Sequence, residues 1–137
     1  MVKAINLKNL DYGVRIGSNE ISDLTIARIG WLLPAITAPM AMIVHILLGN
    51  ARTFPIFISE ADYPGLERWI FTIGLCCAGI IQMFFAYRMW HSMKDDGRRK
   101  LMHITLICGL FTGGNLVIMS FSNMYDYLAL HVLTASN

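Results

Sequence analysis

Charged residues are scarce in this sequence, and three long stretches lack them altogether. Asp, Glu, Lys and Arg supply 15% of the 137 residues, whereas hydrophobic residues supply 55%. Residues 29–51, 69–87 and 101–125 contain none of the four charged types. A helix needs about 20 apolar residues to cross the hydrocarbon layer of a membrane. The sequence therefore predicts an all-α integral membrane bundle with three transmembrane helices, at 29–50, 68–89 and 101–121.

An excess of charge of one sign is also lacking, because the formal net charge is only +2. So small a charge, spread along the chain, gives no indication of a nucleic-acid partner. The basic residues instead gather before the first expected helix and in the 91–100 loop. Since Lys and Arg are retained on the cytosolic side of membrane helices, we expect the N-terminus and this loop in the cytosol. The membrane is then a plasma membrane or an endomembrane, and the 50–67 loop faces outward or into a lumen.

Cysteines and metal-binding patterns are equally sparse. Cys76, Cys77 and Cys108 all fall inside expected helices, and adjacent cysteines rarely bridge, so we expect packing residues and no disulfide framework. No HExxH or HxxxH spacing is present, and such spacings are typical of metal sites. The sequence therefore has no metal signature, and it contains no catalytic constellation.

Residues 1–27 form the expected cytosolic segment, and residues 28–137 form the expected transmembrane domain. Charged residues interrupt the first positions of the chain, so no signal-peptide core is present there. Ser22 followed by Asp23 is typical of a helix N-cap. A short interfacial helix could precede it on the membrane surface, with an irregular apolar face of Ile5, Leu7, Leu10 and Val14.

Small residues recur at the spacing that lets membrane helices approach closely. Gly74 and Ala78 lie one turn apart in the second expected helix, and Gly109 and Gly113 form a GxxxG in the third. Because lipid is as apolar as leucine, close backbone packing drives helix association in membranes. The pattern fits packing within the chain or a dimer face, and the first reading is favoured.

Two prolines and two amides interrupt the apolar helices. Pro34 and Pro39 each remove an amide donor from the first helix. Lipid offers no replacement partner, so a neighbouring helix or a hydroxyl such as that of Thr37 must compensate. Gln82 and Asn115 are expected to form hydrogen bonds between helices, with a ligand contact as the alternative.

Carboxylates and histidines concentrate at the outer ends of the expected helices. The stretch from Phe54 to Glu67 carries a turn signal at Pro64 and Gly65. We expect a negatively charged, outward-facing hairpin as the distinctive surface of the protein. The group can anchor loops and cap helices, or it can form a ligand site; its members are His45, Glu60, Asp62, Glu67, Asp126 and His131.

The last part of the chain begins like a fourth membrane helix. A polar connection at 122–126 precedes an apolar stretch from Tyr127 to Ala135. The stretch is about ten residues short of a crossing. Either the sequence belongs to a longer protein, or this segment lies along the outer surface.

Three short motifs recur in this arrangement: Pro55 with Ile58-Ser59-Glu60, Pro64 with Glu67, and His131 with Thr134-Ala135. With the helices around them, over approximately residues 31–135, they resemble the DRAM/FRAG1/SFK1 family of multi-pass membrane proteins. It implies a non-catalytic protein that organises lipids or partner proteins in the membrane. The family has six membrane helices, so a chain with three needs partners to cover its remaining surfaces. The expected partners are therefore membrane lipids and other subunits or further copies of this chain.

A second interpretation makes the chain an accessory subunit of a larger membrane complex. Ala41 lies one turn before His45, which is the spacing at which a helix can bring a flat tetrapyrrole to an axial imidazole. The resemblance implies no cofactor, whereas this alternative implies a tetrapyrrole at His45. An absorption spectrum of the purified protein distinguishes them.

Overall fold

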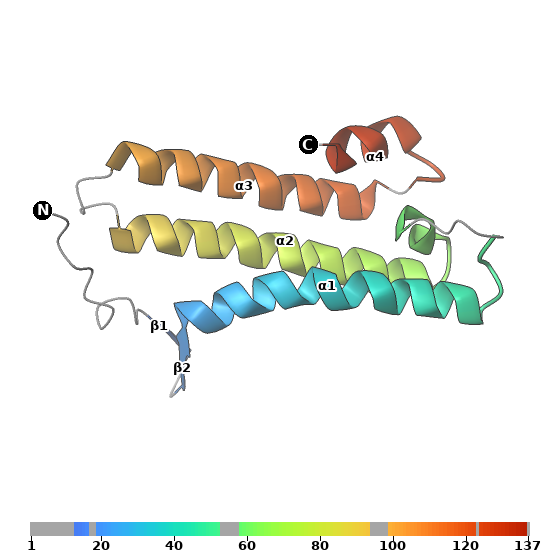
Figure 1. Cartoon of the computed structure of the whole chain (residues 1–137), viewed down its shortest axis with the longest axis horizontal. Coiled ribbons are helices and arrows are strands. Elements are labelled where there is room, and N and C mark those ends of the chain that lie inside the picture. The colour runs from blue at the N-terminus through green and yellow to red at the C-terminus, as the bar shows by residue number, and fades with distance from the viewer. Residues whose placement is uncertain (1–12, 17–18, 53–57, 94–98, 123, 137) are drawn as a thin grey trace, which may run out of the picture.

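The computed structural model describes residues 13–16, 19–52, 58–93, 99–122 and 124–136. Three long helices lie side by side, with α2 between α1 and α3, and a short fourth helix folds back beside α3 (Figure 1). The elements are β1 (Gly13–Ile16), β2 (Asn19–Ser22), α1 (Asp23–Leu47), the 3₁₀ helix η2 (Ile58–Asp62), α2 (Leu66–Met93), α3 (Arg99–Phe121) and α4 (Leu128–Ala135).

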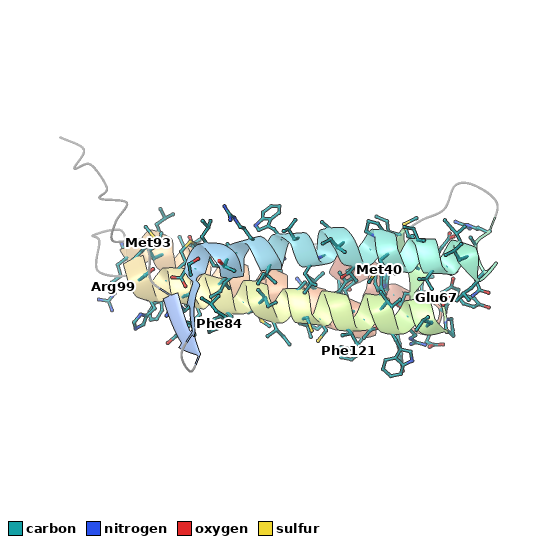
Figure 2. All side chains as sticks on the ribbon, turned by 90° about the horizontal axis from the view of Figure 1, so that it is seen from below. Met40, Glu67, Phe84, Met93, Arg99 and Phe121 are labelled. Atoms are coloured by element: carbon teal, nitrogen blue, oxygen red, sulfur yellow. The ribbon has the colours of Figure 1, made fainter. Side chains whose placement is uncertain are left out.

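The helices α1, α2 and α3 are each long and apolar enough to cross a membrane. Their side chains project outward along the whole rod, with Glu67 near one end and Met93 and Arg99 near the other (Figure 2). Large apolar groups are among the exposed ones: Trp31 is 80% exposed and Phe111 is 60% exposed. Water would penalise such surface, whereas lipid would not. The prediction of an all-α membrane bundle is therefore confirmed.

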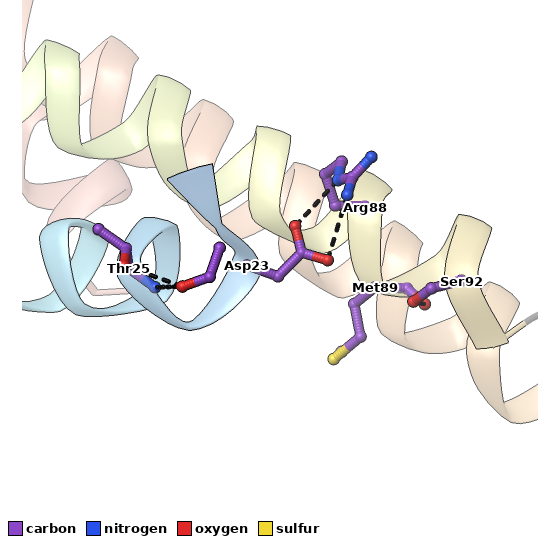
Figure 3. A network of polar contacts seen from close by, with 6 residues as sticks. Asp23, Thr25, Arg88, Met89 and Ser92 are labelled. Atoms are coloured by element: carbon purple, nitrogen blue, oxygen red, sulfur yellow. Dashed lines mark hydrogen bonds and ion pairs between the residues drawn. The ribbon is translucent and has the colours of Figure 1, made fainter. Parts of the chain in front are cut away.

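The helix α1 begins at Asp23, six residues before the first expected position, because its charged first turn is compensated. Ser22 caps the helix, its Oγ accepting a hydrogen bond from Thr25 N at 3.2 Å. The Arg88 guanidinium of α2 donates to both carboxylate oxygens of Asp23, at 3.0 and 3.3 Å (Figure 3). A two-pronged contact of this kind is stronger than a single ionic hydrogen bond. It fastens the start of α1 to the last turns of α2.

Gln82 compensates for the amide that Pro34 lacks. In an uninterrupted helix the amide of residue 34 would donate to the carbonyl of Gly30, and proline cannot. Instead, Nε2 of Gln82 on α2 donates to the Gly30 oxygen at 3.3 Å. The expectation of a compensating neighbour is therefore met at this carbonyl by an amide that crosses between helices.

Glycines bring α2 and α3 into backbone contact. A Cβ added at Gly79 would lie 2.6 Å from the Gly113 carbonyl oxygen, and one added at Gly113 would lie 2.7 Å from that of Gly79. Only glycine permits this approach. Gly109 likewise faces Ala86 of α2, Gly74 faces α1, and Ala78 is fully buried. The small residues thus face neighbouring helices of the same chain.

The N-terminal segment differs from the expected interfacial helix where it is described. Residues 13–16 and 19–22 pair as an antiparallel hairpin, with Gly13 opposite Ser22 and Ile16 opposite Asn19. Gly13 disfavours a helix there, since glycine loses more backbone entropy in a helix than alanine does. The helix α1 begins at Asp23, after the Ser22 cap, so its first turns lie within residues 1–27 of the expected cytosolic segment. Residues 1–12 of the expected interfacial helix lie outside the described residues.

The cysteines lie less deeply than expected for packing residues. All three are free thiols, and Cys77 and Cys108 are exposed on the helix surfaces. Their environment within the membrane-spanning helices is therefore lipid as much as protein.

Candidate functional site

The described part of the 50–67 connection packs against the bundle and buries its carboxylates, so it is not the negatively charged surface that the sequence predicts. The 3₁₀ helix η2 buries three consecutive residues, with Glu60 4% exposed and Ala61 and Asp62 fully buried. Ala61 joins an apolar cluster with Ala41 of α1 and with Phe71 and Leu75 of α2. This cluster pulls η2 inward and takes the neighbouring carboxylates with it. Residues 53–57, which carry the Pro55 part of the family resemblance, lie outside the described residues.

Glu67 and His45 form a buried pair between α1 and α2. His45 Nδ1 lies 3.2 Å from Glu67 Oε1, and the side chains are 1% and 0% exposed. Asn50 Nδ2 donates to the same oxygen at 2.9 Å. His45 lies in the last turn of α1 and Glu67 in the first turn of α2. The dipoles of both helices favour a positive imidazole and a negative carboxylate at these positions.

Asp62 is the least satisfied polar group of this region. The residue is fully buried, and among the described residues neither carboxylate oxygen has a hydrogen-bond partner. Its closest basic group is Arg68, with Nε 3.9 Å from Oδ1. Burial raises the pKa of Asp62 from its ordinary 3.8 to about 6, although the nearby Arg68 and His131 oppose the shift. The carboxyl is therefore easily protonated.

Arg68 and Glu60 link this region to the surrounding loops. Arg68 Nη2 lies 3.6 Å from Asp126 Oδ2, so one guanidinium bridges η2 and the α3–α4 connection. Asp126 itself is 60% exposed. Arg52 forms an ion pair with Glu60. Exposed ion pairs contribute little on their own, but a buried carboxylate needs such a partner.

His131 holds α4 against the bundle. Its imidazole is 5% exposed, and Nδ1 donates to the Ser122 carbonyl oxygen at 2.6 Å. The carbonyl lies just after the last turn of α3, where no helical amide can reach it. The contact closes the turn between α3 and α4 and directs α4 back along α3 (Figure 1).

Two tyrosines complete the region, and neither is among the six expected site residues. The Tyr63 ring lies 5.6 Å from the His45 ring and 5.4 Å from the Tyr125 ring, centroid to centroid. The second contact is edge to face, an arrangement that aromatic rings prefer. Burial, with the charge of Glu60 nearby, raises the pKa of Tyr125. The position of Tyr63 beside the Pro64-Gly65 turn is the signal that could have indicated it.

The six expected site residues thus come to one end of the bundle, which we call the acidic end. His45 contacts Glu67, Glu60 contacts Arg52, and Asp62 lies near Asp126 and His131, whose charges act on its carboxyl. Within the described part of the chain, no group of three or more His, Cys, Asp or Glu side chains could hold a metal ion. The arrangement therefore fastens helix ends and loops to one another.

The tetrapyrrole interpretation requires open space beside His45, and the geometry does not provide it. Ala41, the residue expected to make that room, is fully buried in the apolar cluster. The His45 imidazole is 1% exposed and lies against Glu67 and Tyr63. The structure favours the hydrogen-bonded role of His45 over an axial-ligand role.

Comparison with known proteins adds no assignment to this geometry. No protein-family model, no curated protein and no solved structure matches the chain.

Proposed function

We propose that this chain is a non-catalytic, multi-pass membrane protein of DRAM/FRAG1 type that organises lipids or partner proteins around its acidic end. The observation that carries the proposal is that the carboxylates of this end are buried and not exposed to solvent. The carboxylates Glu60, Asp62 and Glu67 point inward, each toward a basic side chain. A site for chemistry on a substrate would instead present such groups to an open cleft.

The outer surface of the acidic end carries large apolar side chains. We call this set the apolar rim; each member is 45–67% exposed, and the members are Ile58, Leu66, Trp69, Tyr125, Tyr127 and Leu128. Aromatic residues are enriched at membrane interfaces, where a partly polar ring is favoured. A rim held rigidly by buried pairs can define which lipids or membrane proteins lie beside it.

In this proposal the acidic end faces outward or into a lumen, and the other end of the bundle, where α2 ends and α3 begins, faces the cytosol. The basic residues around the second connection support this orientation. The membrane is a plasma membrane or an endomembrane.

Co-purification tests the proposal. We expect Ile58→Ser combined with Trp69→Ser to change the lipids and proteins that co-purify in mild detergent, as measured by native mass spectrometry. The matched control is Tyr87→Ser combined with Leu101→Ser, at positions 48% and 52% exposed near the other end. An unchanged set of co-purifying molecules in the rim variant would contradict the proposal.

A second function, an accessory subunit of a larger membrane complex, is favoured by one face of α3. Of the three spans, α3 has the smallest buried share, at 11%. A Cβ added at Gly114 would meet no atom within 4 Å. A small residue on an open helix face lets another membrane helix approach closely. Purification of a homo-oligomer with no other subunit would contradict this alternative.

A further inference from the structure

A groove lies between α1 and α3, within the spans that are apolar enough to cross a membrane. Because α2 packs against both helices, Gln82 of α2 is among the lining residues, and α4 contributes Thr134. The volume is about 340 Å³, within the range of small-ligand sites. The lining includes Pro34 of α1, Gln82 of α2, Asn115 and Leu116 of α3, and Thr134 of α4.

The depth of the groove follows from the position of Asn115. This residue lies six positions before Phe121, the last residue of α3. At 1.5 Å per residue it is about 9 Å below the end of the helix. A molecule that enters the groove from the membrane therefore meets Asn115 within the apolar span of α3 and not at its end.

Asn115 offers hydrogen bonds that no described residue takes. Its amide has two donors and an acceptor, and none of them is paired with a described residue, whereas the Gln82 amide donates to Gly30. The Thr134 hydroxyl donates to the Leu130 carbonyl at 2.9 Å, which leaves its oxygen able to accept. An unpaired amide in hydrocarbon is costly. A ligand with both a donor and an acceptor would remove this cost.

The lining also excludes a charged ligand group. None of the residues that line the groove is charged, and an ion at this depth would lose its hydration without gaining a counter-charge. A hydroxyl is uncharged and is both donor and acceptor. The apolar side of the groove, including Leu116, suits a hydrocarbon body.

We propose that this groove binds an uncharged lipid with a free hydroxyl at its polar end, the hydroxyl lying against Asn115 and the hydrocarbon body extending past Leu116 into the bilayer. Diacylglycerols and sterols share this chemistry. The inference rests on the proposed function, in its lipid-organising form, and names the class of lipid.

Photolabelling of the purified full chain in phosphatidylcholine vesicles tests the site. One probe is a diazirine-bearing diacylglycerol and the other a diazirine-bearing sterol, each paired with its own hydroxyl-O-methyl ether. We expect labelling of peptides from α2 and α3 by at least one hydroxyl probe, and much weaker labelling by its ether. The probe that labels the chain shows whether the bound lipid is a diacylglycerol or a sterol.

Two variants localise the binding. Asn115→Leu keeps a similar volume and removes the hydrogen bonds, so labelling should fall roughly three- to tenfold, the effect of one hydrogen bond on affinity. Leu116→Trp should fill the groove and reduce labelling further. Gly114→Ala is the matched control, because its added Cβ would meet open space.

Several outcomes would overturn the site: equal labelling by the ethers, unchanged labelling in Asn115→Leu, or crosslinks between two chains at Asn115 in place of a lipid adduct. The comparison of the hydroxyl probe with its ether uses the wild-type chain. It therefore tests whether binding requires the hydroxyl even if a variant fails to fold. Loss of this site alone would leave the co-purification result at the apolar rim unchanged, whereas failure of the proposed function would appear in that result.

Discussion

At the scale of single residues, Asp62 is the clearest case of a buried polar group that lacks hydrogen bonds to the described residues. A carboxylate without exposure and without hydrogen bonds is costly to keep ionised, and this is the physical cause of its raised pKa. Arg68 at 3.9 Å offsets only part of the cost. Glu67 is better satisfied, since His45 and Asn50 both bond its Oε1, although among the described residues its Oε2 has no hydrogen-bond partner.

Asp62→Asn should make the protein more stable at neutral pH. The pKa of Asp62 is about 6 in the folded state and near 3.8 in the unfolded chain, so the folded state binds the proton more tightly. The free energy of unfolding therefore falls as the pH rises from about 3.8 to about 6. The full loss is about 3 kcal/mol at 1.36 kcal/mol per pKa unit. Thermal unfolding in detergent at pH 4, 6 and 7.5 would measure it.

Asp126→Asn removes the same charge from the exposed partner of Arg68 and serves as the control. Its stability relative to the wild type should change little with pH. A constant difference between Asp62→Asn and the wild type across this range would show that the Asp62 carboxyl is not the titrating group.

Glu67→Ala should destabilise the fold by about 3 kcal/mol, because it leaves His45 buried without its partner. Glu67→Gln keeps an acceptor for Asn50 and should cost less. Thermal unfolding of the two variants in the same detergent gives the comparison. Equal losses in both variants would mean that the charge, and not the acceptor, stabilises the pair.

At the scale of helices, Pro34 leaves the Gly30 carbonyl of α1 without a helical donor, and a residue on another helix supplies one. The side-chain amide of Gln82 on α2 donates a hydrogen bond to this carbonyl oxygen. The pair therefore sets the rotation of α2 against α1, because an amide can reach this carbonyl from only a narrow range of positions.

A double-mutant cycle tests whether Gln82 compensates for the amide that Pro34 lacks. Gln82→Leu should cost about 1–2 kcal/mol in the wild type, since it leaves the Gly30 carbonyl unpaired in an apolar environment. In a Pro34→Ala background the helix supplies its own amide, so the same substitution should cost little. Unfolding free energies of the four proteins yield the coupling energy. A coupling energy near zero would remove Gln82 from this role.

The extent of each helix shows what hydropathy can predict and what it cannot. Stretches without charge located all three spans, but the predicted bounds differ from the observed ones: α1 begins at Asp23 instead of residue 29, and α2 extends to Met93 instead of residue 89. The early start of α1 places Asp23 opposite Arg88 of α2, and the two charges pair across the helices. Such a pairing depends on the register between helices, which a single stretch of sequence does not contain.

At the scale of the whole molecule, antiparallel packing brings distant residues to one end. Alternating crossings sufficed to predict that His45, Glu67 and His131 would lie at the same end. They did not reveal that η2 turns inward, because that depends on Ala61 fitting among Ala41, Phe71 and Leu75. A small apolar residue between two carboxylates carries no recognisable signal in the sequence.

The orientation in the membrane can be tested with single cysteines in a chain whose three native cysteines are replaced by alanine. Ser92→Cys near the basic end should be labelled by an impermeant maleimide only from the cytosolic side. Asp126→Cys, at an exposed position of the acidic end, should be labelled only from the other side. Reversed labelling would contradict the proposed orientation, and labelling of both from one side would contradict the three-span arrangement.

The inward-turned carboxylates also determine how this end responds to salt. Arg52 lies beside Glu60, whereas the single Arg68 lies within 4 Å of both Asp62 and Asp126, so the two guanidinium charges offset the carboxylates of this end only in part. The remaining negative charge should slow the association of anionic partners and speed that of cationic ones, and both effects should weaken as ionic strength rises.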